Sequence, residues 1–341
     1  MTMVMGRSIP LSLATLVPPG QGLEQRGRQQ RETTQLHTPV MRAEVLEHLR
    51  DAPGGTMVDG TLGLGGHADA LLEARDDIHL LGIDRDSDAL ELADLRLARW
   101  SGRYELCRAD YRTLSEMSSA RGWAPLAAIL IDLGASSLQL GTAERGFSFR
   151  LEGPLDMRMD QRQPRTAAEL VDRLSGDELR SLIRDYGEEP HAARIARAIV
   201  KARAIEPITT TTRLAEIIDA AVPQRGPRRI HPATRTFQAI RIAINNELDG
   251  LQEFVIGASR LLAPGGRLIV LAFHSLEDRA IKRAFKHLAS DCECPPELPQ
   301  CLCDKRSEVK ILTSRPLTPG EDEVASNRRA RSAKMRVLER T

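Results

Sequence analysis

Short apolar runs alternate with amphipathic segments along the first part of the chain. Helical patterns separate these runs at 68–74 and 87–99, and the second opens on Ser87, a common helix-capping residue. Strands that alternate with helices are typical of a parallel sheet covered by helices. The apolar runs have the length of buried strands and lie at 56–59, 78–84, 104–109 and 127–133.

This alternation stops after residue 133. No convincing strand pattern follows until residue 266, and helical patterns dominate the segment between. These helical patterns lie at 167–174, 177–186, 191–204, 212–221 and 236–262. Strand patterns then resume at 266–272, 308–312 and 334–339, with a helix at 276–288.

The economical interpretation is one α/β domain that a helical insert of about 100 residues interrupts. Two consecutive domains would leave the run at 266–272 without a sheet to join. We expect about seven strands in the single sheet. The predicted parts are a disordered extension at 1–35, the α/β domain at 36–138 and 236–341, and the helical insert at 139–235.

Composition narrows the class of protein. Hydrophobic residues make up 41% and charged residues 28% of the 341 residues, as in soluble globular proteins. No apolar run approaches the ~20 residues that span a bilayer, so no membrane partner is expected. The five cysteines are odd in number and mostly clustered, unlike an extracellular disulfide framework, which favours the cytoplasm. A net charge of +1 neither favours nor excludes a nucleic acid.

A glycine-rich turn follows the first predicted strand. Asp59 leads the turn, and glycines follow at 63, 65 and 66. A dinucleotide site prefers G-x-G-x-x-G for its pyrophosphate, whereas a leading acid favours a cationic ligand such as S-adenosylmethionine. Asp84 ends the next strand, where a carboxylate can accept hydrogen bonds from both hydroxyls of a ribose. A plain turn between a core strand and a helix is the alternative.

Four acids stand at the ends of predicted strands, where ligands bind in open α/β sheets. They are Asp59, Asp84, Asp110 and Asp132, of which Asp110 could instead cap a helix. Asp132 opens the segment DLGASS, where amino-group methyltransferases carry an acid or Asn followed by prolines and an aromatic. This chain lacks the prolines and the aromatic, so the analogy with those enzymes is incomplete.

Longer motifs resemble one family closely. The chain from about residue 36 to 341 resembles the bacterial ribosomal small-subunit RNA cytosine-N4-methyltransferases. These motifs are long and unusual, so the resemblance is specific. The motifs are HTPV at 37–40, DGT at 59–61, GGH at 65–67, DLG at 132–134, ERGFSF at 144–149, GPLDMRM at 153–159, YGEE at 186–189, HPATRTFQ at 231–238 and FHSLEDR at 273–279.

The resemblance implies a class I methyltransferase fold, Rossmann-like, with an inserted helical domain. It implies S-adenosylmethionine-dependent methylation of the exocyclic amine of one cytosine in the decoding region of 16S ribosomal RNA. The partner would be that RNA within the small ribosomal subunit, and a homodimer is a further expectation. A DNA or protein methyltransferase, or a non-catalytic ribosome assembly factor, is the alternative. The implied cofactor contacts are Gly65, Gly66, His67, Asp84, Tyr111, Asp132 and Gln139.

Methyl transfer from a sulfonium needs positioning more than acid–base chemistry. Asp132 is the first candidate to orient the amine and take its proton, and His274 and Glu277 are the second. A helix-capping role is the competing interpretation of His274.

Residues 191–235 contain nine Lys or Arg and three acids, a basic balance that favours contacts with phosphates. For Arg194, Arg197 and Lys201, which recur at helical spacing, a solvated helix face is the alternative. The target cytosine must leave its stack to reach the methyl group, and the aromatics best placed to receive it are Phe147, Phe149 and Phe237. The candidate substrate contacts are Phe147, Arg228, Arg229, Arg235 and Phe237.

Two cysteine pairs flank a proline-rich segment near the C-terminus. Cys292 and Cys294 form one pair, and Cys301 and Cys303 the other. Four thiolates could hold a structural Zn²⁺, although C-x-C is tighter than the usual C-x₂-C spacing.

Overall fold

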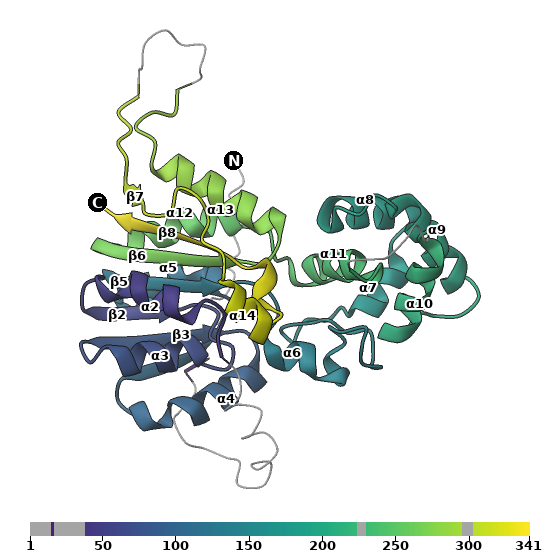
Figure 1. Cartoon of the computed structure of the whole chain (residues 1–341), viewed down its shortest axis with the longest axis horizontal. Coiled ribbons are helices and arrows are strands. Elements are labelled where there is room, and N and C mark those ends of the chain that lie inside the picture. The colour runs from purple at the N-terminus through teal and green to yellow at the C-terminus, as the bar shows by residue number, and fades with distance from the viewer. Residues whose placement is uncertain (1–14, 17–37, 224–229, 295–302) are drawn as a thin grey trace, which may run out of the picture.

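The computed structural model describes residues 15–16, 38–223, 230–294 and 303–341. An α/β domain and a helical unit lie side by side (Figure 1). The remaining residues include most of the predicted disordered extension at 1–35, as well as Arg228, Arg229 and Cys301, so these predictions fall outside the described residues.

A single mixed sheet forms the centre of the α/β domain. Its strand order is β1-β4-β3-β2-β5-β6-β8-β7 among the described residues. The five neighbouring strands β4, β3, β2, β5 and β6 are parallel. β8 is antiparallel to β6, and β7 is antiparallel to β8. The strands are β1 (Thr15–Leu16), β2 (Gly55–Asp59), β3 (Ile78–Asp84), β4 (Tyr104–Arg108), β5 (Leu126–Asp132), β6 (Leu262–Ala272), β7 (Val309–Ile311) and β8 (Lys334–Arg340).

The seven predicted strands are present, and β1 adds an eighth that the sequence did not indicate. Thr15 and Leu16 pair with Arg108 and Cys107 of β4, within the segment expected to be disordered. Two residues are too few to show the apolar periodicity of a strand. This pairing depends on the edge strand β4, which has backbone groups available to pair, and it becomes visible only in the structure.

Helices cover both faces of the sheet, which explains the continuous apolar runs of its strands. On one face, α2 (Arg42–Arg50), α3 (Gly66–Ala74) and α4 (Ser87–Leu97) pack their apolar side chains on the sheet. On the other face lie α5 (Leu114–Arg121), α12 (Leu251–Leu261) and α13 (Ser275–Leu288). Asp86 rather than the predicted Ser87 caps α4, because its carboxylate accepts the N–H of Asp88.

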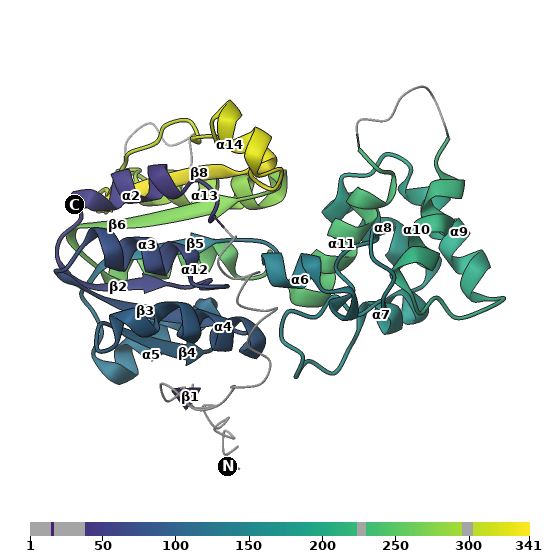
Figure 2. The same ribbon diagram turned by 60° about the horizontal axis from the view of Figure 1, so that its bottom comes forward.

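The helical unit has its own apolar core. Capping boxes begin α7 at Thr166 and Glu169 and α8 at Ser175 and Glu178, because each hydroxyl and carboxylate pair satisfies free N–H groups. In Figure 2, α6 (Ser137–Gly141) lies between the sheet and this unit. The unit consists of α7 (Ala167–Arg173), α8 (Gly176–Gly187), α9 (Ala192–Arg203), α10 (Thr211–Ala221) and α11 (Ala233–Asn245).

The boundary between the helical insert and the second part of the α/β domain, expected at residue 236, lies elsewhere in the structure. That boundary falls inside α11, which packs on α8 and α7 and so belongs to the helical unit. The single helix expected at 236–262 is two helices, because Asn246 and Gly250 take left-handed conformations between α11 and α12. No described helix is long and apolar enough to span a bilayer.

Asn245 joins α11 to the segment at 157–159. Its side-chain amide donates to the carbonyl of Met157 at 2.8 Å and accepts the N–H of Met159 at 2.8 Å, in a fully buried position. We expect Asn245→Ala to lower the free energy of unfolding by about 2–3 kcal/mol, because it leaves two buried backbone groups unpaired. Urea unfolding measures this change.

Asn246→Gly, one residue further, is the matched control. Glycine adopts the left-handed conformation of Asn246 readily, so the free energy of unfolding should change by less than about 0.5 kcal/mol. An equal loss in both variants would show that the amide bonds of Asn245 contribute little.

Candidate active site

A pocket of about 470 Å³ opens where the parallel strands end. This volume is within the usual range for small-ligand sites, roughly 300–1,000 Å³. One wall consists of the glycine-rich turn after β2 and residues at the ends of β3, β4, β5 and β6. Residues in or near the helical unit complete it, among them Met159, Thr234, Arg241 and Glu247.

The turn after β2 requires its glycines. A Cβ on Gly60 would lie 2.5 Å from a methyl group of Ile131, and Gly63 and Gly65 have φ angles of +52° and +72°. Side chains at these positions would be displaced or strained. Gly60, Gly63 and Gly66 line the pocket, whereas Gly65 packs against Ala93 of α4. The turn therefore presents bare backbone to the pocket.

Asp84 is held in one orientation at the end of β3. Its Oδ2 accepts the N–H of Gly63 at 2.8 Å, and its Oδ1 accepts the N–H of Asp86 at 2.9 Å. A carboxylate has about four acceptor positions, so roughly two stay available on the pocket side. Burial raises the pKa of Asp84. The arrangement suits a ligand that brings two hydroxyl donors.

Asp132, at the end of β5, carries a buried oxygen with unused acceptor capacity. Its Oδ1 has no hydrogen-bond partner among the described residues, and its Oδ2 lies 3.7 Å from Nε2 of His67. Burial, with the charges of Asp59 and Glu277, raises the pKa of Asp132 to about 8, and burial raises that of Asp59 to about 7. Asp84, Asp132 and Glu277 all line the pocket, and carboxyl groups gathered in this way favour a cationic ligand.

Tyr111 and Gln139 also line the pocket. The ring of Tyr111 packs edge-on against Phe254 at 4.7 Å between centroids, which fixes its orientation. Gln139 accepts the N–H of Ser136 in the capping box of α6 and donates to Asp86 at 2.9 Å. Its amide therefore orients neighbouring groups from the pocket wall.

His274 and Glu277 form the capping box of α13. The ring of His274 accepts the N–H of Glu277, while the carboxylate of Glu277 accepts the N–H groups of Phe273 and His274. Burial alone would raise the pKa of Glu277, but the hydrogen bond and charge of His274 and the charge of Arg241 outweigh it and lower this pKa. Glu277 lines the pocket and His274 does not, so the geometry gives His274 the capping role.

An ion pair opposite the strand ends was not found from the sequence. Arg241 donates two hydrogen bonds, of 2.9 and 2.8 Å, to the buried carboxylate of Glu247. Arg241 lies in α11 and Glu247 in the break between α11 and α12, so no regular helical spacing relates them. Phe273 also lines the pocket, and the FHSLEDR motif was the only signal for it.

The aromatic residues expected to receive a base lie elsewhere. Phe147 and Phe237 are 6% and 5% exposed, and neither lines the pocket. Phe237 is part of the helical core and packs edge-on against Phe149. The structure does not place either ring at this pocket, so their contact with the substrate stays a prediction. Arg235 is half-buried and donates to the carbonyl of Glu188.

The strand order, the acid-led glycine turn and the carboxylates at the strand ends define a class I S-adenosylmethionine-dependent methyltransferase. The chain belongs to the MraW methylase family, whose sequence model matches residues 34–341. The predicted fold class and family resemblance are thus confirmed.

Relatives named ribosomal RNA small subunit methyltransferase H align along most of the chain. The relative from Nitratidesulfovibrio vulgaris (strain DP4) is 50% identical over 307 residues, which cover 89% of this chain and 95% of that protein. The relative from Geobacter sulfurreducens is 50% identical over 306 residues, which cover 89% and 98%. The solved structure of the O-methyltransferase TomG from Streptomyces achromogenes is 12% identical, covers 92% of this chain and 86% of its own, and has a TM-score of 0.41.

The raised pKa of Asp132 makes stability depend on pH. The carboxyl titrates near pH 8 in the folded protein and near pH 4 in the unfolded chain. Between these values the folded state binds more protons, so the free energy of unfolding falls as the pH rises. We expect Asp132→Asn to stabilise the cofactor-free protein at pH 8 by about 1–3 kcal/mol, and to change it little at pH 4.

Urea unfolding at both pH values, followed by circular dichroism, measures this difference. Asp76→Asn is the matched control, because Asp76 is an exposed acid before the opposite end of β3. If Asp132→Asn changed the free energy of unfolding equally at both pH values, the assignment of a raised pKa to Asp132 would be contradicted.

Proposed function

We propose that this protein transfers a methyl group from S-adenosylmethionine to N4 of a cytosine in the decoding region of 16S ribosomal RNA. The observation that carries the proposal is the buried Oδ1 of Asp132, a hydrogen-bond acceptor without a partner among the described residues, at the edge of a pocket suited to a cation. The names of the relatives support ribosomal RNA as the substrate.

The cofactor would lie along the strand ends. Asp84 would accept hydrogen bonds from the two ribose hydroxyls, and Tyr111 would cover the adenine. The bare backbone near Gly66, together with His67, would receive the methionine part. The sulfonium would then lie near the carboxylates of the pocket, whose mutual repulsion a positive charge relieves.

The bound cofactor supplies an electrophilic methyl group on a sulfonium. Asp132 would accept a hydrogen bond from the cytosine amine and aim the nitrogen at that methyl. A cation beside Asp132 lowers its pKa from about 8, so its carboxylate is ionised when it is needed as an acceptor. Asp132 would take the proton that the amine gives up on methylation and pass it to solvent.

The helical unit would bind the RNA. Exposed arginines such as Arg194 and Arg197 lie on α9, within the basic segment 191–235 that the sequence marks for phosphate contacts. The assembled small ribosomal subunit as substrate, a cytoplasmic location and a homodimer remain predictions.

Methyl incorporation distinguishes this function from its alternatives. The protein with labelled cofactor should label small ribosomal subunits or their RNA, and digestion should yield N4-methylcytidine. Labelling of DNA or protein instead would identify a different substrate, and no labelling of any of the four would identify an assembly factor.

Asp84→Ala tests the ribose contact. Loss of the carboxylate leaves two hydroxyls of the bound cofactor unpaired, so we expect at least roughly tenfold weaker binding with the fold intact. Titration calorimetry with S-adenosylmethionine measures the affinity, and circular dichroism checks the fold. Asp76→Ala, which changes an exposed acid before the other end of β3, should bind normally. Unchanged affinity in Asp84→Ala would remove the ribose assignment.

Asp132→Asn tests the chemical step. The amide keeps the shape and one acceptor but loses the charge that takes the proton. We expect the single-turnover rate at saturating cofactor to fall by at least roughly tenfold, with a much smaller change in binding of ribosomal subunits. Cofactor affinity must be measured in the same variant, because Asp132 lines the cofactor pocket. A wild-type rate at saturation would move the assignment to Glu277.

A further inference from the structure

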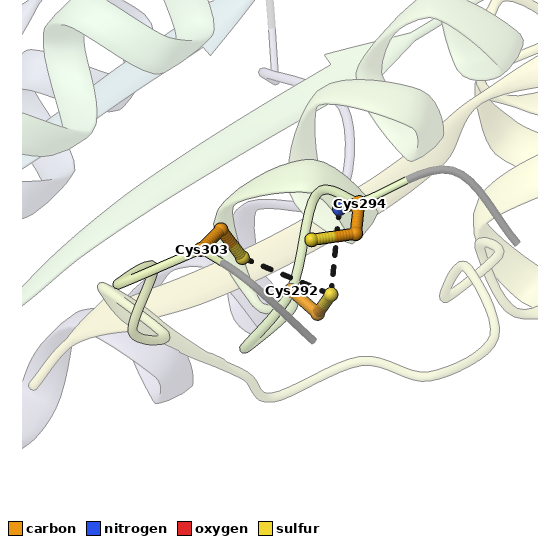
Figure 3. Close-up of side chains that lie close together, drawn as sticks. All are labelled: Cys292, Cys294 and Cys303. Carbon is orange, nitrogen blue, oxygen red and sulfur yellow. Dashed lines mark hydrogen bonds between the residues drawn. The ribbon is translucent and has the colours of Figure 1, made fainter. Parts of the chain in front are cut away.

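Three cysteines meet where the chain leaves α13 and returns to β7. Cys292 and Cys294 follow the helix, and Cys303 precedes the strand (Figures 1 and 3). Their sulfur atoms all lie within 4.8 Å of one another, and the Sγ atoms of Cys292 and Cys303 are 3.8 Å apart. None of the three lines the active-site pocket, so the methyl-transfer chemistry does not account for them.

Contacts that do not involve sulfur hold the two segments together. The N–H of Ser307 donates to Asp291 at 2.8 Å, and the N–H of Glu308 donates to the carbonyl of Leu288 at 3.0 Å. The ammonium group of Lys305 donates to Ser290 at 3.0 Å. Hydrogen bonds that do not involve sulfur therefore bring the thiols together.

The spacing of the thiols fits a tetrahedral metal site. A Zn–S bond of about 2.3 Å places two sulfur ligands roughly 3.8 Å apart at the tetrahedral angle, which is the distance between Cys292 and Cys303. A disulfide would need about 2.05 Å. A role in core packing does not fit either, since Cys292 is exposed and the other two are half-buried.

Backbone N–H groups point at the sulfur atoms as well. The N–H of Glu293 donates to Cys303 at 3.5 Å, and the N–H of Cys294 donates to Cys292 at 3.4 Å (Figure 3 draws the second). Such bonds stabilise sulfur in its thiolate form and orient it toward a metal.

We propose that the thiolates of Cys292, Cys294 and Cys303 bind a structural Zn²⁺ that joins the two segments between α13 and β7. Each thiol loses its proton when the metal binds. A fourth ligand completes the tetrahedron, and Cys301, which the sequence groups with the other three, lies outside the described residues. The site is independent of the proposed RNA substrate.

Metal analysis of the full chain tests the proposal. The protein purified with zinc and freed of loosely bound metal should retain roughly one zinc per chain by mass spectrometry. Cys292→Ser and Cys303→Ser should each lose most of it. Cys107→Ser is the matched control, because Cys107 is buried in β4 away from the cluster, and it should retain the metal.

Two measurements on the unaltered protein keep the test independent of how the variants fold. Cobalt(II) in place of zinc should give thiolate-to-metal charge-transfer absorption and the visible bands of a tetrahedral site. A chelator should increase the number of thiols that react rapidly with a thiol reagent. Absence of retained zinc and of the cobalt bands, a disulfide in the purified protein, or full zinc retention in both serine variants would overturn the proposal.

Discussion

The pocket is organised around buried carboxyl groups at the carboxyl edge of one parallel sheet. Asp59 and Asp132 end adjacent strands, and Glu277 begins the helix that follows the next strand. Burial raises the pKa of Asp59 to about 7, and burial with the charges of neighbouring acids raises that of Asp132 to about 8, whereas His274 and Arg241 keep the pKa of Glu277 low. A cationic ligand relieves this repulsion, so the site that costs stability in the empty protein favours a sulfonium when it is filled.

The helical unit is part of this site rather than an appendage. Arg85, just after β3, donates to the carbonyl of Asn245 and to the sulfur of Met159. Asn245 in turn holds the backbone of Met157 and Met159. The same segment, with Arg241 and Glu247, completes the pocket wall. The unit proposed to bind RNA and the sheet proposed to position the cofactor therefore share one hydrogen-bonded wall of the pocket.

Short sequence patterns predicted those features of the site that depend only on neighbouring residues in the chain. The glycine-rich turn was recognised because its backbone conformations and close contacts exclude side chains, and Asp84 because an acid ended an apolar run. The sequence could not tell whether Phe147 and Phe237 lie at the pocket. An aromatic residue looks the same in a sequence whether it packs in a core or faces a ligand, and here both rings are buried, Phe237 within the helical core.

The sequence by itself determined the class of fold, the family and the acids at the strand ends, because hydrophobic periodicity, glycine conformation and long motifs are properties of short segments. Only the tertiary structure decided which residues share the pocket. Arg241 in α11 pairs with Glu247, which lies in a break where the sequence predicted one continuous helix, and His274 caps α13 and does not line the pocket. The sequence had grouped the cysteines by their spacing, and contacts between the segments after α13 and before β7 bring three of their sulfur atoms within 4.8 Å of one another.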